Sequence, residues 1–423
     1  MSALKRAGIL PWILVAIVAG IAFGFFFPES LSRIFFSFNE IFSQFLGFAI
    51  PLIIVGLIVP AIADLGHGAG KWLGITAAIA YGSSLFAGLL TFFAAKAVYP
   101  FLISVADKPD IATESSAGKG YLSQLEIPPV FGVMTALLLA FTIGIGLSLA
   151  PRGVIRKGFV EFREIITALI AKVIVPFLPL HIFGIFLNLT QTGEIAAVLS
   201  AVAKVVVFVL ILEVIILATQ YGIAGAVAKK NPFKALATML PAYFTALGTS
   251  SSAATIPVTL RQTVAAGVSQ PVASFVVPLC ATIHLAGSMS KITAFAMAVI
   301  AMNGLTIPTA QMIGFIFMLG VIMIAAPGVP GGAIMAAVGI LGSMLGFDDA
   351  MLGLMIATYI ALDSFGTATN VTGDGAIALV VDKFARGDVG SPSEGADGFR
   401  ARAEFDAETY MESVGGNRTA TVI

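Results

Sequence analysis

The sequence has a single cysteine, Cys280, and only three scattered histidines among its 423 residues. One cysteine excludes an intramolecular disulfide, and the scattered histidines lack the spacing of a metal site. A net charge of zero gives no reason to expect a nucleic-acid partner. The phosphate-binding pattern GxxxxGK[ST] is missing, and no serine has an obvious His–Asp partner. The sequence therefore predicts neither an ATP-driven pump nor an enzyme, and no organic cofactor.

Charged residues are also scarce, at 11% of the chain against roughly 25% in soluble domains. Hydrophobic residues make up 58%, and the mean hydropathy is +1.01. This composition predicts an all-α polytopic membrane protein embedded in lipid. A spanning helix needs about 20 apolar residues. Eight stretches of about that length are candidates: Ile9–Phe27, Ile41–Ala63, Trp72–Val98, Val130–Leu149, Ile165–Leu189, Ala196–Ile223, Pro271–Met302 and Met351–Val381. The first has no clean cleavage pattern, so we interpret it as a retained helix rather than a signal peptide.

Two further apolar stretches are interrupted in the middle. Gly248-Thr-Ser-Ser-Ser252 divides Phe233–Leu260, and Pro327-Gly-Val-Pro-Gly-Gly332 divides Thr309–Leu345. Each stretch is predicted to form two short helical arms joined by a non-helical tip. Irregular backbone at membrane depth is tolerated only where protein or water satisfies it. We therefore predict two re-entrant helical hairpins.

The positive charges predict the orientation of the chain. Eight spans with two hairpins that return to their own side place most lysines and arginines in cytoplasmic loops, which agrees with the positive-inside rule. Both termini are then cytoplasmic, and the protein lies in the cell inner (plasma) membrane. Residues 387–423 are polar and highly charged, so they are predicted to form a disordered cytoplasmic tail.

The last span contains the most unusual polar residues. A charged group at the bilayer centre costs about 2.5–3.5 kcal/mol and marks a functional site by default. Asp363, Thr367, Asn370 and Asp374 follow one another at steps of four, three and four, so they share one face of a helix. That face is predicted to line a solute or ion site.

Both hairpin tips and the seventh span add polar groups. The hydroxyls and amides of Thr249–Ser252 next to a helix start suit a carboxylate, although a polar turn in a vestibule would look the same. Carbonyls freed by the second tip are able to coordinate Na⁺; the alternative is an ordinary kink. Lys291 lies near the middle of the seventh span and is predicted to pair with Asp363 or Asp374. Lys172 and Glu213 are interpreted as snorkelling residues or a structural pair.

Three ordered motifs resemble one family. These are Thr249-Ser-Ser-Ser-Ala-Ala-Thr-Ile-Pro257, Gly328-Val-Pro-Gly-Gly332 and Asn370-Val-Thr-Gly-Asp374. With them the chain resembles the dicarboxylate/amino acid:cation symporters, which are glutamate-transporter-like secondary transporters. The resemblance implies a homotrimer of the elevator type, with eight transmembrane helices and two hairpins in each subunit. Residues 1–71 and 129–195 would supply scaffold helices 1–2 and 4–5. Residues 72–128 would supply helix 3 and an external loop, and residues 196–386 the rest of the transport domain.

The resemblance also implies roles for individual residues. Asp363 would hold the amino group of the substrate, and Asn370 would contact its α-carboxylate. The residues implied at the substrate are Ser251, Ser252, Ser288, Gly328, Asp363, Thr367 and Asn370. One implied Na⁺ site comprises Asp374 and Asn370 with carbonyls of the seventh span around His284, and another comprises Thr282 with carbonyls around Ala325. Na⁺ would be the coupling ion.

Three departures from the family pattern bear on the substrate. The arginine that acidic-substrate members carry three residues after the amino-binding aspartate is Gly366 here. Where the family has the carboxylate of a third Na⁺ site, this chain has Ala286. Where some members have an arginine in the first hairpin, this chain has Ser250. The first hypothesis is a neutral amino acid such as serine, threonine or alanine. The second is an acidic amino acid or dicarboxylate, with Lys291 replacing the missing arginine and with His284 and Lys291 supporting proton coupling. A channel or receptor on the same helices is a further alternative.

Overall fold

The computed structural model describes residues 10–65, 71–103, 121, 127–148, 153–193, 195–326 and 330–385. Within these ranges all regular structure is helical. The predicted tail 387–423, most of the predicted external loop and Gly328 lie outside the described residues.

The first half of the chain forms long apolar helices. They are α2 Leu10–Gly24, α3 Glu29–Leu65, α4 Lys71–Leu102, α5 Val133–Ser148, α6 Val154–Leu169, the π-helix η3 Ile170–Ile174, α7 Val175–Gln191 and α8 Ile195–Ala228. The second half is more fragmented. It comprises α9 Pro232–Thr238, α10 Leu240–Thr249, α11 Ser252–Ala265, α12 Gln270–Ile283, α13 Ala286–Met302, α14 Thr309–Ala325, α15 Gly332–Leu345, α16 Asp349–Ala361 and α17 Asp363–Ala385.

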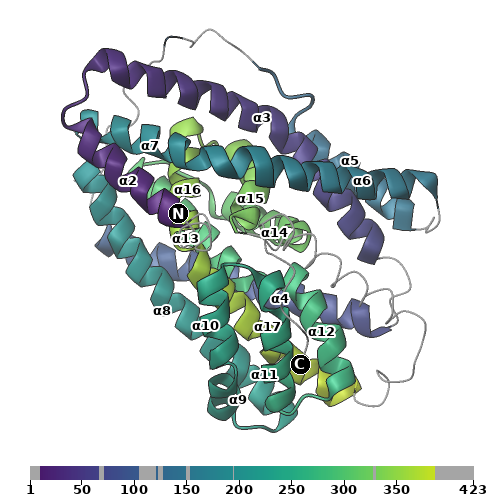
Figure 1. Ribbon diagram of the computed structural model, residues 1–423. Helices are drawn as coiled ribbons and strands as arrows, with labels where there is room; N and C mark the ends of the chain where they lie inside the picture. The colour runs from purple at the N-terminus through teal and green to yellow at the C-terminus, as the bar shows by residue number, and fades with distance from the viewer. Residues whose placement is uncertain are drawn as a thin grey trace, which may run out of the picture.

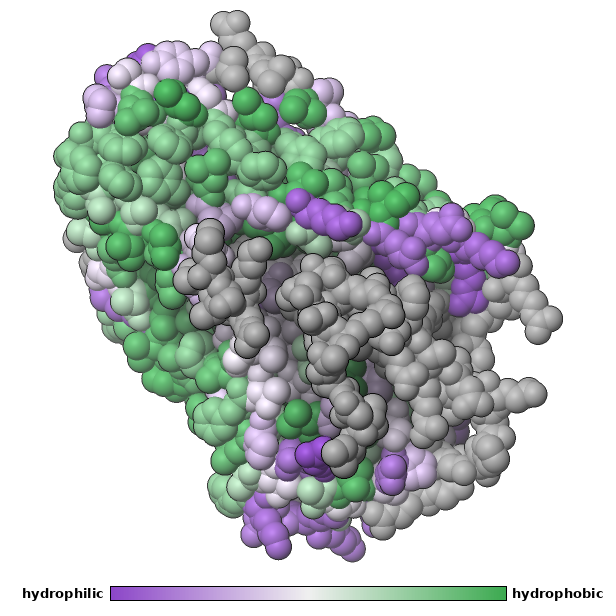
Figure 2. All heavy atoms as spheres, viewed as in Figure 1, coloured by the Kyte–Doolittle hydropathy of each residue, from purple (hydrophilic) through white to green (hydrophobic). Residues whose placement is uncertain are grey.

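Helix length and composition support a polytopic membrane protein. Among the described residues, five helical stretches are long and apolar enough to cross a membrane, or six if the bent pair α16–α17 is one span. Four shorter helices are also apolar, among them α14 and α15. Figure 2 shows a largely apolar surface over α2, α7 and α8, where side chains such as Val18, Ile211 and Val214 are exposed. A surface of this kind suits lipid or another subunit better than water.

The helices fall into two packed groups with a middle layer between them (Figure 1). In the upper group α3 packs against α5, α6 and α7, and α2 packs against α7. In the lower group α17 packs against α8, α10, α11 and α12. Helices α14, α15 and α16 lie between them, where α15 touches α3 and α16 touches α2 and α7.

Both interrupted stretches consist of two helical arms and a tip. Helices α10 and α11 pack side by side, and the chain reverses at Ser250, whose φ of 51° is left-handed. The Ser251 hydroxyl then caps α11 by accepting from the Ala254 amide at 3.3 Å. Helices α14 and α15 pack in the same way, and Gly331, with φ 74°, precedes α15. In each hairpin, the N-terminus of the second helix therefore lies at the tip.

Two spans are broken near their middle. The segment Met351–Val381, expected from its sequence to be one continuous span, is divided at Leu362, where α16 and α17 meet at 61°. At this bend the Leu362 carbonyl accepts a hydrogen bond from the buried Lys291 ammonium. The other break is at His284 and Leu285, between α12 and α13. Helices α13 and α17 pack together, so both broken helices start beside each other.

Candidate substrate and cation site

Asp363 is the first residue of α17 and is the point where three elements meet. One carboxylate oxygen, Oδ2, accepts from the Gly331 amide at the second hairpin tip, at 2.7 Å. The other, Oδ1, lies 3.4 Å from the Lys291 ammonium on α13. Asp363 is buried. A carboxylate at a helix start is also favoured by the helix dipole. The geometry therefore places an anion where a hairpin tip and two broken helices converge.

Lys291 is completely buried beside this carboxylate. Its ammonium donates to the Leu362 carbonyl at 3.1 Å and lies 4.0 Å from the centre of the Tyr359 ring, a cation–π contact. The lysine stem crosses α17 at Gly366: a Cβ there would collide with Lys291 Cε and lie 2.7 Å from Nζ. Gly366, the position of the missing arginine, is thus the gap through which Lys291 passes.

Ser288 and Asn370 join α13 to α17. The Asn370 Oδ1 accepts from the Gly287 amide at 2.7 Å, and its Nδ2 donates to the Ser288 hydroxyl at 3.2 Å. The Tyr359 hydroxyl also donates to Ser288, at 2.9 Å. Both ends of the Asn370 amide are therefore bonded to α13 in this conformation. Asn370 holds the two helix starts together and positions Ser288.

The first hairpin tip reaches the same helix start. The Ser250 and Ser364 hydroxyls are hydrogen-bonded at 2.6 Å, and Ser251 and Ser252 are buried. The start of α11 therefore lies beside the start of α17. Thr367 donates to the Asp363 carbonyl on its own helix, at 2.9 Å. Adjacent helix starts lined with hydroxyls favour binding of a carboxylate.

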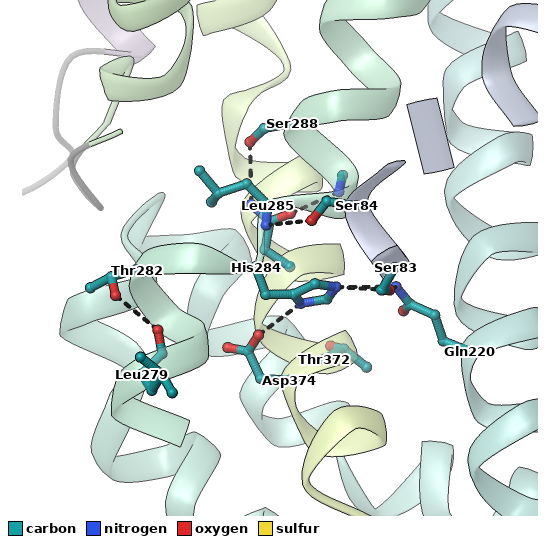
Figure 3. Close-up of polar contacts among 12 residues, drawn as sticks. Ser83, Ser84, Gln220, Leu279, Thr282, His284, Leu285, Ser288, Thr372 and Asp374 are labelled. Carbon is teal, nitrogen blue, oxygen red and sulfur yellow. Dashed lines mark hydrogen bonds and ion pairs between the residues drawn. The ribbon is translucent and has the colours of Figure 1, made fainter. Parts of the chain in front are cut away.

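A second polar centre lies further along α17, around Asp374 (Figure 3). Eleven residues of helix separate Asp374 from Asp363, or about 16 Å. The His284 Nδ1 lies 2.9 Å from Asp374 Oδ1, and its Nε2 lies 3.1 Å from the Ser83 hydroxyl. Gln220 Nε2 donates to the same hydroxyl at 2.9 Å. A neutral imidazole satisfies this chain, with Nδ1–H donating to the carboxylate and Nε2 accepting from Ser83.

Two acceptor oxygens in this region have no partner among the described residues. They are Gln220 Oε1 and the Thr372 hydroxyl oxygen, both buried. Figure 3 shows Thr372 beside Asp374, below the imidazole and toward Gln220. Hard cations prefer oxygen ligands. The Asp374 carboxylate and these two oxygens are therefore candidate cation ligands, and the described residues contain no cluster of three or more His, Cys, Asp or Glu that would hold a metal.

Thr282 and Ala325, which the resemblance assigns to a second Na⁺ site, lie away from this centre. Thr282 is exposed and donates to the Leu279 carbonyl at 2.8 Å, and Figure 3 shows it on the far side of α12 from His284. Ala325 is the last residue of α14, at the second hairpin tip. Gly328 lies outside the described residues. His284 and Asp374 are thus brought together, whereas Thr282 and Ala325 lie elsewhere.

Three residues near the site were missed or misread from the sequence. Tyr359 and Gln220 were not singled out, and Glu213 was interpreted as a snorkelling or structural residue. Glu213 is 3% exposed, so it does not snorkel, whereas Lys172 is exposed. Glu213 and Gln220 are seven residues apart in an apolar helix, which puts them on one face. That spacing was the available signal.

Two helical hairpins and two broken helices that meet at buried carboxylates define a membrane transport protein rather than an enzyme. The chain belongs to the sodium:dicarboxylate symporter family, whose profile matches residues 9–384.

Individual relatives are similar over part of this length. The chain is 28% identical over 260 residues to excitatory amino acid transporter 2 of Mus musculus, Rattus norvegicus and Homo sapiens. The aligned part is 60% of this chain and 45% of each relative, so it spans less than half the length of these transporters. The family is one of sodium:dicarboxylate symporters, and the long apolar helices among the described residues fit a protein of this kind embedded in a membrane.

Proposed function

We propose that this protein is a secondary active symporter that carries a small neutral amino acid, such as serine, threonine or alanine, into the cell together with Na⁺. The observation that carries the proposal is the Asp363 carboxylate, which lies between the second tip and Lys291 without an arginine at Gly366. The carboxylate suits a substrate amino group. The one buried cation beside it is already engaged by Asp363 and Leu362, so a second substrate carboxylate would lack a partner, which is costly.

The α-carboxylate of the substrate is assigned to the helix starts. Ser251 and Ser252 on the first tip, with Ser288 and Thr367, offer hydroxyls close to three helix N-termini. Asn370 supports this set through Ser288, and Gly328 belongs to the second tip.

Na⁺ is assigned to two places. Asp374 would bind one ion with the unpartnered oxygens of Gln220 and Thr372, and the His284 backbone would lie beside it. Thr282 and carbonyls around Ala325 would bind a second ion. Closure of both tips over the substrate would then depend on the cations, which couples the two solutes.

The larger assembly follows from the same proposal. Residues 1–71 and 129–195 would form a fixed scaffold, and residues 72–128 and 196–386 a transport domain that moves as an elevator. Eight spans with two re-entrant hairpins place both termini in the cytoplasm. Three copies would form the homotrimer in the plasma membrane.

A second candidate substrate is an acidic amino acid or a dicarboxylate. The observation that favours it is the Lys291 ammonium, which lies 2.7 Å from the point where a side chain at Gly366 would begin. Lys291 therefore supplies positive charge where related transporters have arginine. In this version His284 would contribute to proton coupling.

Replacing Lys291 with methionine separates the two candidates. If the substrate is neutral, its amino group pairs with Asp363 in the absence of Lys291. Na⁺-driven serine uptake then stays within about threefold of the wild-type rate, a free-energy difference below about 1 kcal/mol. The measurement is initial uptake of serine, alanine, aspartate and succinate in proteoliposomes, with Na⁺ and pH gradients imposed separately. Lys96→Met, which changes an exposed lysine, is the matched control. Loss of aspartate or succinate uptake alone would favour the second candidate.

Replacing Asp374 with asparagine tests the cation assignment. Loss of the carboxylate charge is expected to raise the Na⁺ concentration for half-maximal uptake about tenfold, which corresponds to about 1.4 kcal/mol. Titration of uptake rate against external Na⁺ measures the effect. Asp382→Asn is the control on the same helix, because Asp382 accepts from the Ser269 amide at the start of α12 and lies away from the cation. An unchanged Na⁺ titration in Asp374→Asn would remove this residue from the cation site.

A further inference from the structure

Glu213 is a second buried carboxylate within reach of the Lys291 charge. It lies on α8, is 3% exposed, and neither oxygen makes a well-formed hydrogen bond among the described residues. The Thr369 hydroxyl lies beside it, and the Lys291 ammonium interacts with it electrostatically. Lys291 in turn interacts electrostatically with both Asp363 and Glu213. One buried cation is therefore shared between two buried acids, and only Asp363 holds it in this conformation.

The lysine has a path between these acids along α17. Asp363, Gly366 and Thr369 follow one another at intervals of three residues, each about 4.5 Å along the helix axis. The lysine stem lies over Gly366, with its ammonium at the Asp363 end, and Thr369 at the other end lies beside Glu213. No side chain at Gly366 obstructs the stem. Rotation about the lysine side-chain bonds is the movement by which the head group would pass along the helix.

A substrate amino group changes the balance of charge at Asp363. One carboxylate cannot compensate two ammonium groups, and a buried cation that loses its partner costs several kcal/mol. The present ion pair is also long, at 3.4 Å, compared with about 2.7–2.9 Å for strong charge-assisted bonds. Meanwhile no cation bonds to the Glu213 carboxyl group among the described residues. Both terms favour transfer of the lysine to Glu213.

We propose that Glu213 takes over the Lys291 ammonium when a substrate amino group occupies Asp363, which makes Glu213 a specificity-determining residue for amino-bearing substrates. The substrate half of this inference rests on the proposed function, whereas the exchange between the two acids does not. A dicarboxylate without an amino group leaves Lys291 on Asp363.

The exchange can be tested without any substrate. Asp363→Asn removes the competing charge, so Lys291 is expected to pair with Glu213 in that background. Glu213→Gln should then lower the thermal unfolding midpoint in detergent by several degrees, and adding Lys291→Met should abolish that effect. In the chain that keeps Asp363, Glu213→Gln should leave the midpoint unchanged or raise it. An equal effect of Glu213→Gln in both backgrounds would overturn the exchange.

The role in specificity is tested by serine binding, measured calorimetrically on the purified full chain. Glu213→Gln is expected to weaken serine binding about tenfold, because Lys291 then has only Asp363 and competes with the amino group. Glu213→Gln with Lys291→Met should bind as Lys291→Met alone does. Glu164→Gln, an exposed glutamate on α6, is the control. A Glu213→Gln affinity equal to wild type, or a defect that survives Lys291→Met, contradicts the role. If the wild type binds no serine, the proposed function fails, and the stability measurements still decide the exchange.

Discussion

Uptake of the amino acid substrate is expected to fall at least about 100-fold when Asp363 is replaced by alanine, a loss of about 3 kcal/mol or more. The substitution removes the anion for the amino group and the acceptor of the Gly331 amide at the second tip. It also removes the carboxylate that Lys291 contacts, so the lysine keeps the Leu362 carbonyl and the Tyr359 ring and is expected to turn to Glu213. The measurement is the initial rate of Na⁺-driven serine uptake in proteoliposomes, normalised to the amount of reconstituted protein.

The control is Asp349→Ala, which removes an exposed aspartate from the first turn of α16 and should leave uptake near wild type. Asp363→Ala should elute at the same oligomeric size as the wild type, which separates loss of function from loss of fold. Adding Lys291→Ala should not restore uptake, because the carboxylate for the substrate amino group is still missing. A normal rate in Asp363→Ala would remove this residue from the substrate site.

The polar face of the last span was predictable because it depends only on local spacing. Polar groups in an apolar segment have to turn toward protein, and steps of three and four residues place them on one side of a helix. Helix α17 contains Asp363, Thr367, Asn370 and Asp374 within one continuous helix. The two helical arms of both interrupted stretches were equally predictable from the sequence, since Gly, Pro and Ser mark the tips.

Contacts between helices that are distant in the sequence were harder to predict. At the break, the Leu362 carbonyl accepts a hydrogen bond from Lys291, which lies 71 residues earlier in the chain. His284 contacts Asp374, which lies 90 residues further along the chain. From the sequence, both were predicted at Na⁺, but no contact between them was predicted. Spacing along a helix predicts which residues share a face, but not which face of another helix lies opposite. Those partners are set by packing of whole helices.

The approach of α13 to α17 gives the largest expected effect on stability. A Cβ at Gly287 would lie 2.5 Å from the Gly366 carbonyl oxygen, 2.9 Å from the Gly366 Cα and 2.9 Å from the Thr369 Cβ. Two of these atoms belong to the backbone and cannot rotate away. Gly287→Ala is therefore expected to destabilise the protein by about 3 kcal/mol or more, at the upper end of overpacking costs. Thermal unfolding in detergent measures this change.

The same substitution should also reduce transport. The Gly287 amide bonds to Asn370, and the next residue, Ser288, bonds to both Asn370 and Tyr359. Separation of the helices by even 1 Å would misplace these groups, and displacements of that size cost up to about 100-fold in rate. Gly314→Ala on α14 is the control, because nothing lies within 4 Å of its Cβ position. Gly314→Ala should be neutral or stabilising, by up to about 1 kcal/mol. If Gly287→Ala matches this control in stability and uptake, α13 and α17 are not in the close contact that holds both helix starts at the substrate.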